Sequence, residues 1–170
     1  MGAGGPPLAP RAAPGAAAPS AGPVRYGPEI LAALDRLCEA DPGREACGFV
    51  VRRSGVLAVV QVPNAADRLH AEDPVAFPRT ARHAYVMEPR AQLRLYRELE
   101  AAGGVVVAVW HSHVEAGAHL SEVDRAGALL DGRPVVPGAE HLVLGLRGGR
   151  VAERRRYRHL EGAFVGSVLD

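Results

Sequence analysis

The sequence lacks lysine and has little net charge. Its 20 basic residues are all arginine, against 19 acidic residues, for a formal net charge of +1. A balance this close to neutral lacks the positive excess typical of nucleic-acid-binding and membrane-surface proteins, so we expect neither kind of partner. Without lysine, no side-chain amine is available for acylation. Together with 20 glycines and 14 prolines, the arginine-only usage indicates a coding bias.

Long hydrophobic runs and cysteines are also scarce. No apolar run reaches the roughly 18 residues of a membrane-spanning helix. The two cysteines, Cys38 and Cys47, lie in segments predicted as a buried helix and a buried strand, and no secretion-signal pattern precedes them. We therefore expect reduced core thiols in a reducing, cytoplasmic location, and no disulfide.

Large side chains are almost missing from residues 1–23, where proline, glycine and alanine dominate. Such a segment has little to bury, so we predict a disordered leader followed by a folded domain at residues 24–170. A chain of 170 residues suits one domain with its own hydrophobic core.

Hydrophobic spacing predicts helices and strands that alternate along residues 24–170. The expected helices are 28–40, 89–103 with Leu93, Tyr96 and Leu99 on one face, and 121–130 with Ser121 as its cap. The expected strands form a hairpin at 46–62, a short strand at 83–87, a buried strand at 104–110 and a closing hairpin at 141–160. Residues 63–83 are predicted to form a loop beside the substrate, because connections of this length tend to be functional. This order indicates an α/β fold of the α+β type, with a single mixed sheet flanked by helices.

Residues 111–124, HSHVEAGAHLSEVD, place two histidines directly after the predicted buried strand. Residues i and i+2 of a strand face the same side, so His111 and His113 can point at one site. Asp124 follows in the first turns of the next helix. Two imidazoles and one carboxylate, with a fourth position left for water, suit a catalytic zinc ion. The histidine pair alone is weak evidence, because most such pairs are ordinary surface or core residues.

Three neighbouring side chains offer alternative roles. His119 and Glu115 compete with Asp124 as ligands, although both are otherwise interpreted as solvated loop residues. Cys47 could be taken for a nucleophile, but its apolar neighbours favour a packed thiol.

The complete pattern His-x-His, seven residues, Ser, two residues, Asp resembles the signature of the JAMM (MPN+, or Jab/MPN) zinc metalloproteases. That family also has an upstream glutamate before small and apolar residues, and the stretch REACGFVV supplies Glu45 in that setting. The resemblance implies that His111, His113 and Asp124 hold one zinc ion. It implies that Glu45 and Ser121 are catalytic: the glutamate carries protons between the attacking water and the leaving amine, and the serine helps to hold the oxyanion. It also implies a fold layered as in cytidine deaminases.

The compact chain is similar to the prokaryotic, single-domain branch of that family. The similarity implies a ubiquitin-like sulfur-carrier protein as the substrate, from which a group beyond the C-terminal Gly-Gly is removed by peptidase or isopeptidase chemistry. Val114 and Leu120 depart from the family pattern, which commonly has proline at both positions. Neither is a ligand, so the departures bear only on the rigidity of the loop and on substrate fit.

Three other functions share parts of this pattern. A catalytically silent MPN scaffold, which only assembles complexes, typically lacks a ligand or the glutamate. A DNA-repair-associated JAMM relative carries a similar signature, but the neutral charge and the setting of Glu45 argue against it. A zinc nucleoside deaminase needs His-x-Glu and Pro-Cys-x-x-Cys, and neither occurs. The sequence carries no indication of the oligomeric state.

Overall fold

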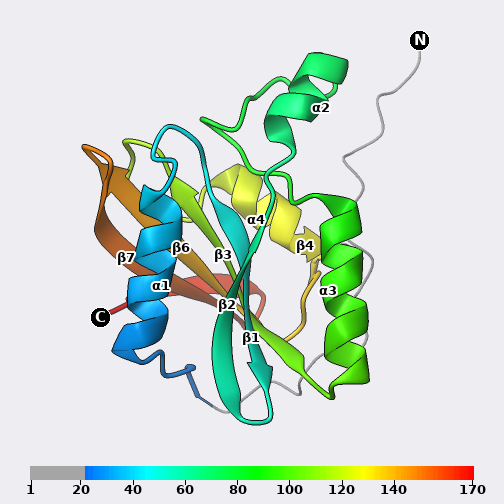
Figure 1. The fold of residues 1–170 in the computed structure, drawn as a ribbon, viewed down its shortest axis with the longest axis vertical. Coiled ribbons are helices and arrows are strands. Elements are labelled where there is room, and N and C mark those ends of the chain that lie inside the picture. The colour runs from blue at the N-terminus through cyan, green and yellow to red at the C-terminus, as the bar shows by residue number, and fades with distance from the viewer. Residues whose placement is uncertain (1–21) are drawn as a thin grey trace.

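The computed structural model describes residues 22–170 and has one six-stranded sheet at its centre (Figure 1). The strands of this sheet follow the order β2-β1-β3-β6-β7-β8. The strands are β1 Cys47–Arg53, β2 Val56–Val62, β3 Val105–His113, β4 Leu129–Leu130, β5 Arg133–Pro134, β6 Glu140–Arg147, β7 Arg150–Leu160 and β8 Ala163–Val168. The helices are α1 Pro28–Glu39, α2 Ala66–Glu72, α3 Pro89–Ala101 and α4 Glu122–Ala128. Residues 1–21 of the predicted leader lie outside the described residues, so its disorder and the domain boundary near Val24 stay predictions.

The central sheet is mixed. β3 and β6 run parallel, and the other neighbouring strands run antiparallel. Two-residue turns close all three of its hairpins: Ser54 and Gly55 have φ angles of 48° and 82°, Gly148 and Gly149 have 56° and 75°, and Glu161 and Gly162 have 49° and 84°. Positive φ at both turn residues matches the twist of the flanking strands. The predicted α+β class, with helices flanking a single mixed sheet, is therefore confirmed.

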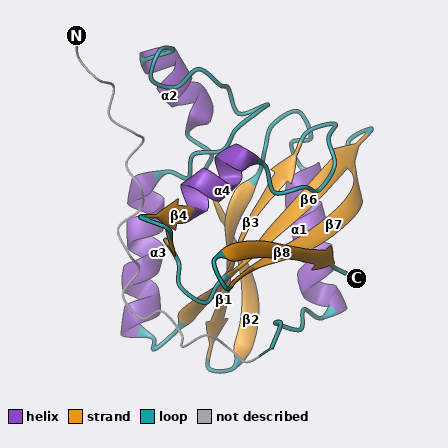
Figure 2. Ribbon diagram, turned by 180° about the vertical axis from the view of Figure 1, so that it is seen from behind, coloured by secondary structure: helices purple, strands orange, loops and turns teal. Residues whose placement is uncertain are grey.

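Helix α1 covers one face of the sheet (Figures 1 and 2). Ile30, Leu34 and Cys38 recur every four residues along it, so they share the face that packs with Trp110 and Leu142 of the sheet. Cys38 is fully buried and carries a free thiol, which confirms the prediction of a reduced core cysteine.

Helix α3 packs against the opposite face. Its buried residues are Leu95, Tyr96 and Leu99, and the Tyr96 ring lies 5.7 Å from the ring of Phe49 on β1. The prediction that Leu93 shares this face is wrong, because its side chain is half exposed. Leu93 lies about 60° around the helix from Tyr96, on the side away from Leu95 and Leu99, so it falls outside the buried stripe and Leu95 is buried instead.

The segment between β2 and α3 differs from the prediction in two places. Residues 66–72 form helix α2, which was not predicted. Ala66 is its only buried residue, so its sequence has no apolar stripe at helical spacing. The strand predicted at 83–87 is absent, and this segment makes one isolated bridge, between Asn64 and Met87. Its backbone groups bond instead to the side chain of Asn64: the carbonyl of Ala84 accepts from it and the amide of Val86 donates to it.

The end of the chain also differs in detail. Helix α4 ends at Ala128, before the predicted residue 130, because Leu129 is extended and starts the short ribbon β4–β5. The closing hairpin β6–β7 is confirmed, with its turn at Gly148 and Gly149. A further edge strand, β8, pairs with β7 and was not predicted, because its mostly exposed sequence AFVGSV lacks a buried alternation.

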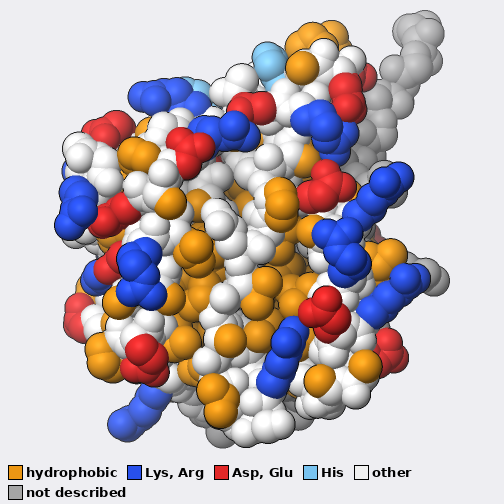
Figure 3. Space-filling model, viewed as in Figure 1, with side chains coloured by type: hydrophobic (Ala, Val, Ile, Leu, Met, Phe, Trp, Pro, Cys, Tyr) orange, Lys and Arg blue, Asp and Glu red, His pale blue; other side chains and the backbone are white. Residues whose placement is uncertain are grey.

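Apolar side chains gather in the middle of the face shown in Figure 3, where β1 and β2 lie between α1 and α3, and charged side chains surround them. Within residues 22–170, no helix is long and apolar enough to cross a membrane.

Candidate metal centre

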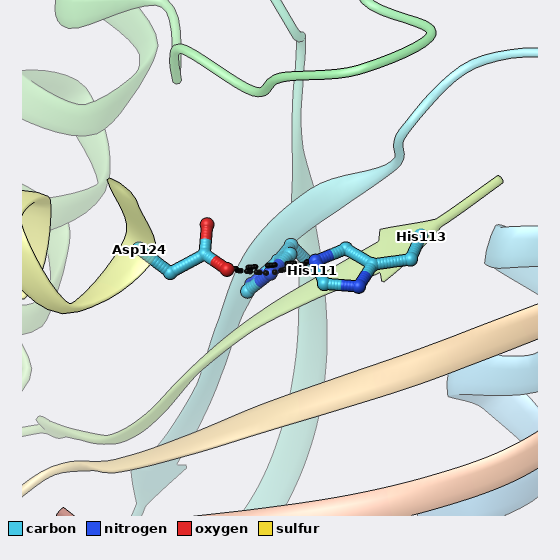
Figure 4. Close-up of side chains that lie close together, drawn as sticks. All are labelled: His111, His113 and Asp124. Atoms are coloured by element: carbon cyan, nitrogen blue, oxygen red, sulfur yellow. Dashed lines mark hydrogen bonds and ion pairs between the residues drawn. The ribbon is translucent and has the colours of Figure 1, made fainter. Parts of the chain in front are cut away.

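Three side chains that can bind a metal converge at the end of β3 (Figure 4). The Nε2 atoms of His111 and His113 lie 3.1 Å apart. The Oδ2 atom of Asp124 lies 3.4 Å from Nε2 of His111 and 3.5 Å from Nε2 of His113. No other group of three histidine, cysteine or acidic residues within 22–170 brings its ligand atoms together in this way.

Local structure explains why these side chains meet. His111 and His113 are two residues apart on β3, so both face the same side of the sheet. Asp124 is the third residue of α4, whose N-terminus is closed by a reciprocal capping box with Ser121. The Asp124 amide donates to Oγ of Ser121 at 3.1 Å, and the Ser121 amide donates to Oδ2 of Asp124 at 2.8 Å. The cap that starts the helix therefore also aims the carboxylate at the imidazoles.

The three ligand atoms fit a zinc ion. Ligands about 2.1 Å from a tetrahedral zinc are about 3.4 Å from one another, which is close to the three distances above. Two imidazoles and one carboxylate leave the fourth position of the tetrahedron open, as in catalytic zinc sites. The sequence prediction of which residues come together is thus matched by the geometry, and the structure shows a site that could hold a metal ion.

Hydrogen bonding orients one of the two imidazoles. Nδ1 of His113 lies 3.0 Å from the carbonyl oxygen of Gly117. A proton donated there leaves the lone pair on Nε2, which faces Asp124 and His111. The ring of His111 is oriented differently: it stacks on Tyr85, with centroids 4.5 Å apart and an interplanar angle of 25°.

Burial and charge set the protonation of these ligands. Burial lowers the pKa of His111, although the hydrogen bond and charge of Asp124 oppose this shift. The lowered pKa favours the neutral imidazole, which is the form that binds metals. For His113, burial also acts to lower the pKa, but the Asp124 hydrogen bond and the charge of Glu45 outweigh it, so the pKa is raised. Burial acts to raise the pKa of Asp124, but hydrogen bonds from both histidines hold it far below its ordinary value. Asp124 is therefore an anion at neutral pH.

Glu45 lies beside this cluster, two residues before β1 begins at Cys47. β1 pairs with β3 so that Cys47 lies opposite His111. Ser112, between the two histidines, holds the adjoining backbone twice: its amide donates to the carbonyl of Ala46 at 2.9 Å, and its Oγ accepts from the Ala46 amide at 2.8 Å. Glu45 is only 8% exposed. Burial raises its pKa to about 8, and the charge of His113 opposes this while that of Asp124 adds to it.

The comparisons with known proteins agree with this geometry. The family described as prokaryotic homologs of the JAB domain matches residues 28–159, which is more than half of the chain. The chain belongs to this family. The family resemblance drawn from its sequence motifs is therefore confirmed.

Two solved structures share the fold of this JAB domain. A protein from Desulfitobacterium hafniense is 18% identical, with a TM-score of 0.59, and the match covers 83% of this chain and 87% of that one. A protein from Salinibacter ruber is 20% identical, with a TM-score of 0.51, and the match covers 86% of this chain and 89% of that one. At these identities the likeness concerns the fold alone. Among curated proteins, none matches the chain.

The alternative site residues of the JAB domain lie outside the cluster. His119 is exposed, and its ring centroid is 5.1 Å from that of His113, edge to face. Glu115 is exposed on the loop that follows β3. Cys47 is fully buried with its Sγ 3.5 Å from the carbonyl oxygen of Val62, and burial raises the pKa of its thiol. The prediction of a packed thiol is confirmed.

The loop between β3 and α4 is held to the sheet without the two prolines of the family pattern. The Tyr157 hydroxyl donates to the carbonyl of Ala118 at 2.8 Å, and the Ala118 amide donates to Glu153 at 3.0 Å. Leu120 is 3% exposed and packs in the same small core as Ala118 and Tyr157. Apolar packing and hydrogen bonds thus fix this loop where proline would restrict its backbone.

Gly145 of β6 lies close against the backbone of this loop, and Gly145→Ala tests the contact. A Cβ atom there would lie 2.6 Å from the carbonyl oxygen of Ala116 and 2.8 Å from the amide of Ala118. We expect the substitution to lower the free energy of unfolding by about 1–3 kcal/mol, because backbone has to move. Urea denaturation measures the effect. Gly127→Ala in α4 is the matched control: a Cβ there meets nothing within 4 Å, so equal destabilisation of both variants would contradict the contact.

The raised pKa of Glu45 predicts that the stability of the metal-free protein depends on pH. Its pKa rises from 4.5 to about 8 on folding, so the folded state binds this proton more tightly. The stability that the protonated group contributes is complete below pH 4.5 and is lost as the pH rises through about 8. Above that pH, Glu45→Gln should exceed the wild type in free energy of unfolding by on the order of 3 kcal/mol. Parallel stability curves for the two proteins between pH 5 and about 9, measured by urea denaturation, would show that Glu45 is not buried as described.

No sequence pattern assigned a role to Ser112, Tyr85 or Asn64. The side chain of Ser112 points away from the site and holds the backbone next to Glu45. Strand alternation could have placed it on the opposite face from the histidines. Tyr85 and Asn64 lie in the connection between β2 and α3, outside its helix α2, where no helix or strand periodicity applies.

Proposed function

We propose that this JAB-domain protein is a zinc-dependent peptidase or isopeptidase that hydrolyses the amide bond after the C-terminal Gly-Gly of a ubiquitin-like sulfur-carrier protein. One observation supports this most: two imidazoles and a carboxylate converge within 4.8 Å, and a buried second carboxylate, Glu45, lies beside them. Membership of the JAB family, which includes metalloproteases, adds support.

His111, His113 and Asp124 would hold the zinc ion. When bound there, zinc supplies Lewis acidity, which polarises a carbonyl and lowers the pKa of water towards about 7. The protein's own part is to favour a neutral His111, through its burial, and an ionised Asp124, through the hydrogen bonds from both histidines.

Glu45 would act as the proton carrier. Its carboxylate takes a proton from the attacking water and later delivers it to the amine of the leaving group. A carboxylate with a pKa near the working pH is suited to both steps, since it is a stronger base than a solvated carboxylate and still gives the proton back. The raised pKa of Glu45, caused by burial, provides this.

Ser121 would help to hold the oxyanion. Its Oγ accepts a hydrogen bond from the backbone amide of Asp124, so the hydroxyl lies at the same end of α4 as the proposed metal ligand Asp124. Its proton can be donated to a substrate oxygen, a contribution on the order of 2.7–4 kcal/mol in comparable sites.

The proposed substrate has to be recognised mainly through its folded body. Two glycines offer no side chain to bind, so binding energy remote from the scissile bond has to position the carbonyl. A peptide that copies only the Gly-Gly end should therefore lose turnover as well as affinity.

Mass spectrometry tests the proposal directly. Candidate sulfur carriers encoded near the gene, each extended past Gly-Gly, are incubated with the protein with and without a chelator. We expect loss of the extension, blocked by the chelator and restored by zinc, with much slower cleavage of the isolated tail peptide. Cleavage that ignores the chelator, or equal cleavage of the tail peptide and the whole carrier, would contradict the proposal.

A further inference from the structure

Asn64 is the only asparagine of the sequence, and its side chain joins separate parts of the candidate site. Its Nδ2 donates to the carbonyl of Glu45 at 2.9 Å and to the carbonyl of Ala84 at 3.0 Å. Its Oδ1 accepts from the amides of Ala66 and Val86, both at 3.0 Å. Both donors and both acceptor positions of the side-chain amide are thus used. A side chain with four backbone partners leaves those partners little freedom relative to one another.

Two of these hydrogen bonds hold the backbone on either side of Tyr85. Ala84 and Val86 are both bonded to Asn64, so the position of Tyr85 between them is fixed. Its ring stacks on the imidazole of His111, with centroids 4.5 Å apart. Asn64 therefore acts on a candidate metal ligand through one intermediate ring.

His111 lacks the partner that usually orients a metal-binding imidazole. Such a ring normally donates its second N–H to a carboxylate, a carbonyl or water, as His113 does to Gly117. In the part of the chain that the structure describes, the buried Nδ1 of His111 has no hydrogen-bond partner. Stacking on Tyr85 therefore sets the plane of the His111 ring, and this plane determines where Nε2 points.

We infer that Asn64 and Tyr85 are positioning residues of the metal centre. Asn64 clamps the backbone around Tyr85, and Tyr85 holds the imidazole of His111 in the plane that directs Nε2 towards Asp124. Through its bond to the carbonyl of Glu45, the same Asn64 side chain fixes the proposed proton carrier relative to the ligands. The inference rests on the proposed metal site and adds the residues that align it.

Zinc affinity of the full-length protein, measured by competition with a chromophoric chelator, tests the role of the Tyr85 ring. Tyr85→Phe keeps the ring and should bind zinc within about threefold of wild type, whereas Tyr85→Leu removes the flat face and should bind about 10–100-fold more weakly. Gln92→Ala is the matched control, since the side-chain Nε2 of Gln92 donates to the carbonyl of Met87 in the same segment at 3.0 Å. It should keep wild-type affinity.

Three outcomes would overturn the inference. The first is equal zinc affinity of Tyr85→Leu and wild type. The second is a loss in Gln92→Ala as large as that in Tyr85→Leu, which would mean that loosening of the whole segment is responsible. The third is folded wild-type protein that binds no zinc, which would overturn the proposed function as well; the first two leave that function standing.

Asn64→Asp provides a second variant, independent of whether Tyr85→Leu folds. An aspartate can keep the two accepted hydrogen bonds and loses the two donated ones, to Glu45 and Ala84. Its added negative charge would by itself strengthen binding of a cation, so an affinity at least about 10-fold weaker identifies the lost clamp. The visible spectrum of the cobalt-loaded protein should change as well, because the ligand geometry changes. Unchanged or tighter binding with an unchanged spectrum would contradict the role of Asn64.

Discussion

Glu45→Gln is expected to lower the turnover of a Gly-Gly-extended carrier by about 10²–10⁴-fold while the protein keeps its zinc. Glutamine has nearly the same shape as glutamate but cannot accept and return a proton. Glu45 lies outside the group of three converging ligand atoms, so its loss should leave metal binding intact. Its burial, at 8% exposed, keeps bulk water from taking over the proton transfer.

Two measurements on the same preparation check this prediction: zinc content per chain and the rate of mass loss of the carrier. Glu115→Gln is the matched control, because Glu115 is the other carboxylate of the site loop and is exposed. Full activity of Glu45→Gln would reassign the base, and loss of activity in Glu115→Gln would identify its replacement. Loss of zinc from Glu45→Gln would instead make Glu45 a ligand.

Asp124→Ala is expected to weaken zinc binding by more than about 100-fold, beyond the effect of removing a residue that only orients a ligand. It deletes the carboxylate oxygen that lies 3.4 and 3.5 Å from the two imidazole nitrogens. The same substitution removes half of the capping box of α4, which should cost about 0.5–2 kcal/mol of stability. Chelator competition measures the first effect and thermal unfolding without metal the second.

Two further variants separate the ligand from the cap. Asp124→Asn keeps an oxygen that can accept the amide of Ser121 but has no negative charge, so it should fold like wild type and still bind zinc weakly. Ser121→Ala removes the hydroxyl that accepts from the Asp124 amide and leaves the carboxylate in place. It should lose helix stability and keep most of its zinc affinity. The reverse pattern would show that Asp124 matters as a cap and not as a ligand.

Regular periodicities explain how the sequence could place the two histidines of this site, whereas Asp124 and Glu45 were assigned through the resemblance to the JAMM signature. An apolar run without alternation marks a strand covered on both sides, and a period of two then puts His111 and His113 on one side. Ser121 was predicted as the helix cap, and the structure shows it there, three residues before Asp124. Each of these residues lies within an element whose geometry repeats or directly before its first residue.

The surroundings of the site could not be predicted, because they depend on contacts that follow no period. Asn64 bonds to backbone groups 20 and 22 residues away, and these bonds replace the strand expected at 83–87. The side chains of residues 83–87 are typical of a strand, but the backbone groups of Ala84 and Val86 bond to the Asn64 side chain and not to a neighbouring strand. Leu93 and Leu95 illustrate the same limit within α3, since both are apolar and only packing against the sheet decides which is buried.

The zinc content of the folded, full-length protein at neutral pH is the most direct test of the account. Protein dialysed against a slight excess of zinc, and then against metal-free buffer, is analysed by plasma mass spectrometry. We expect one zinc ion per chain, bound by His111, His113 and Asp124, and a content near zero in Asp124→Ala. Folded wild-type protein without zinc, or equal zinc in wild type and Asp124→Ala, would contradict it.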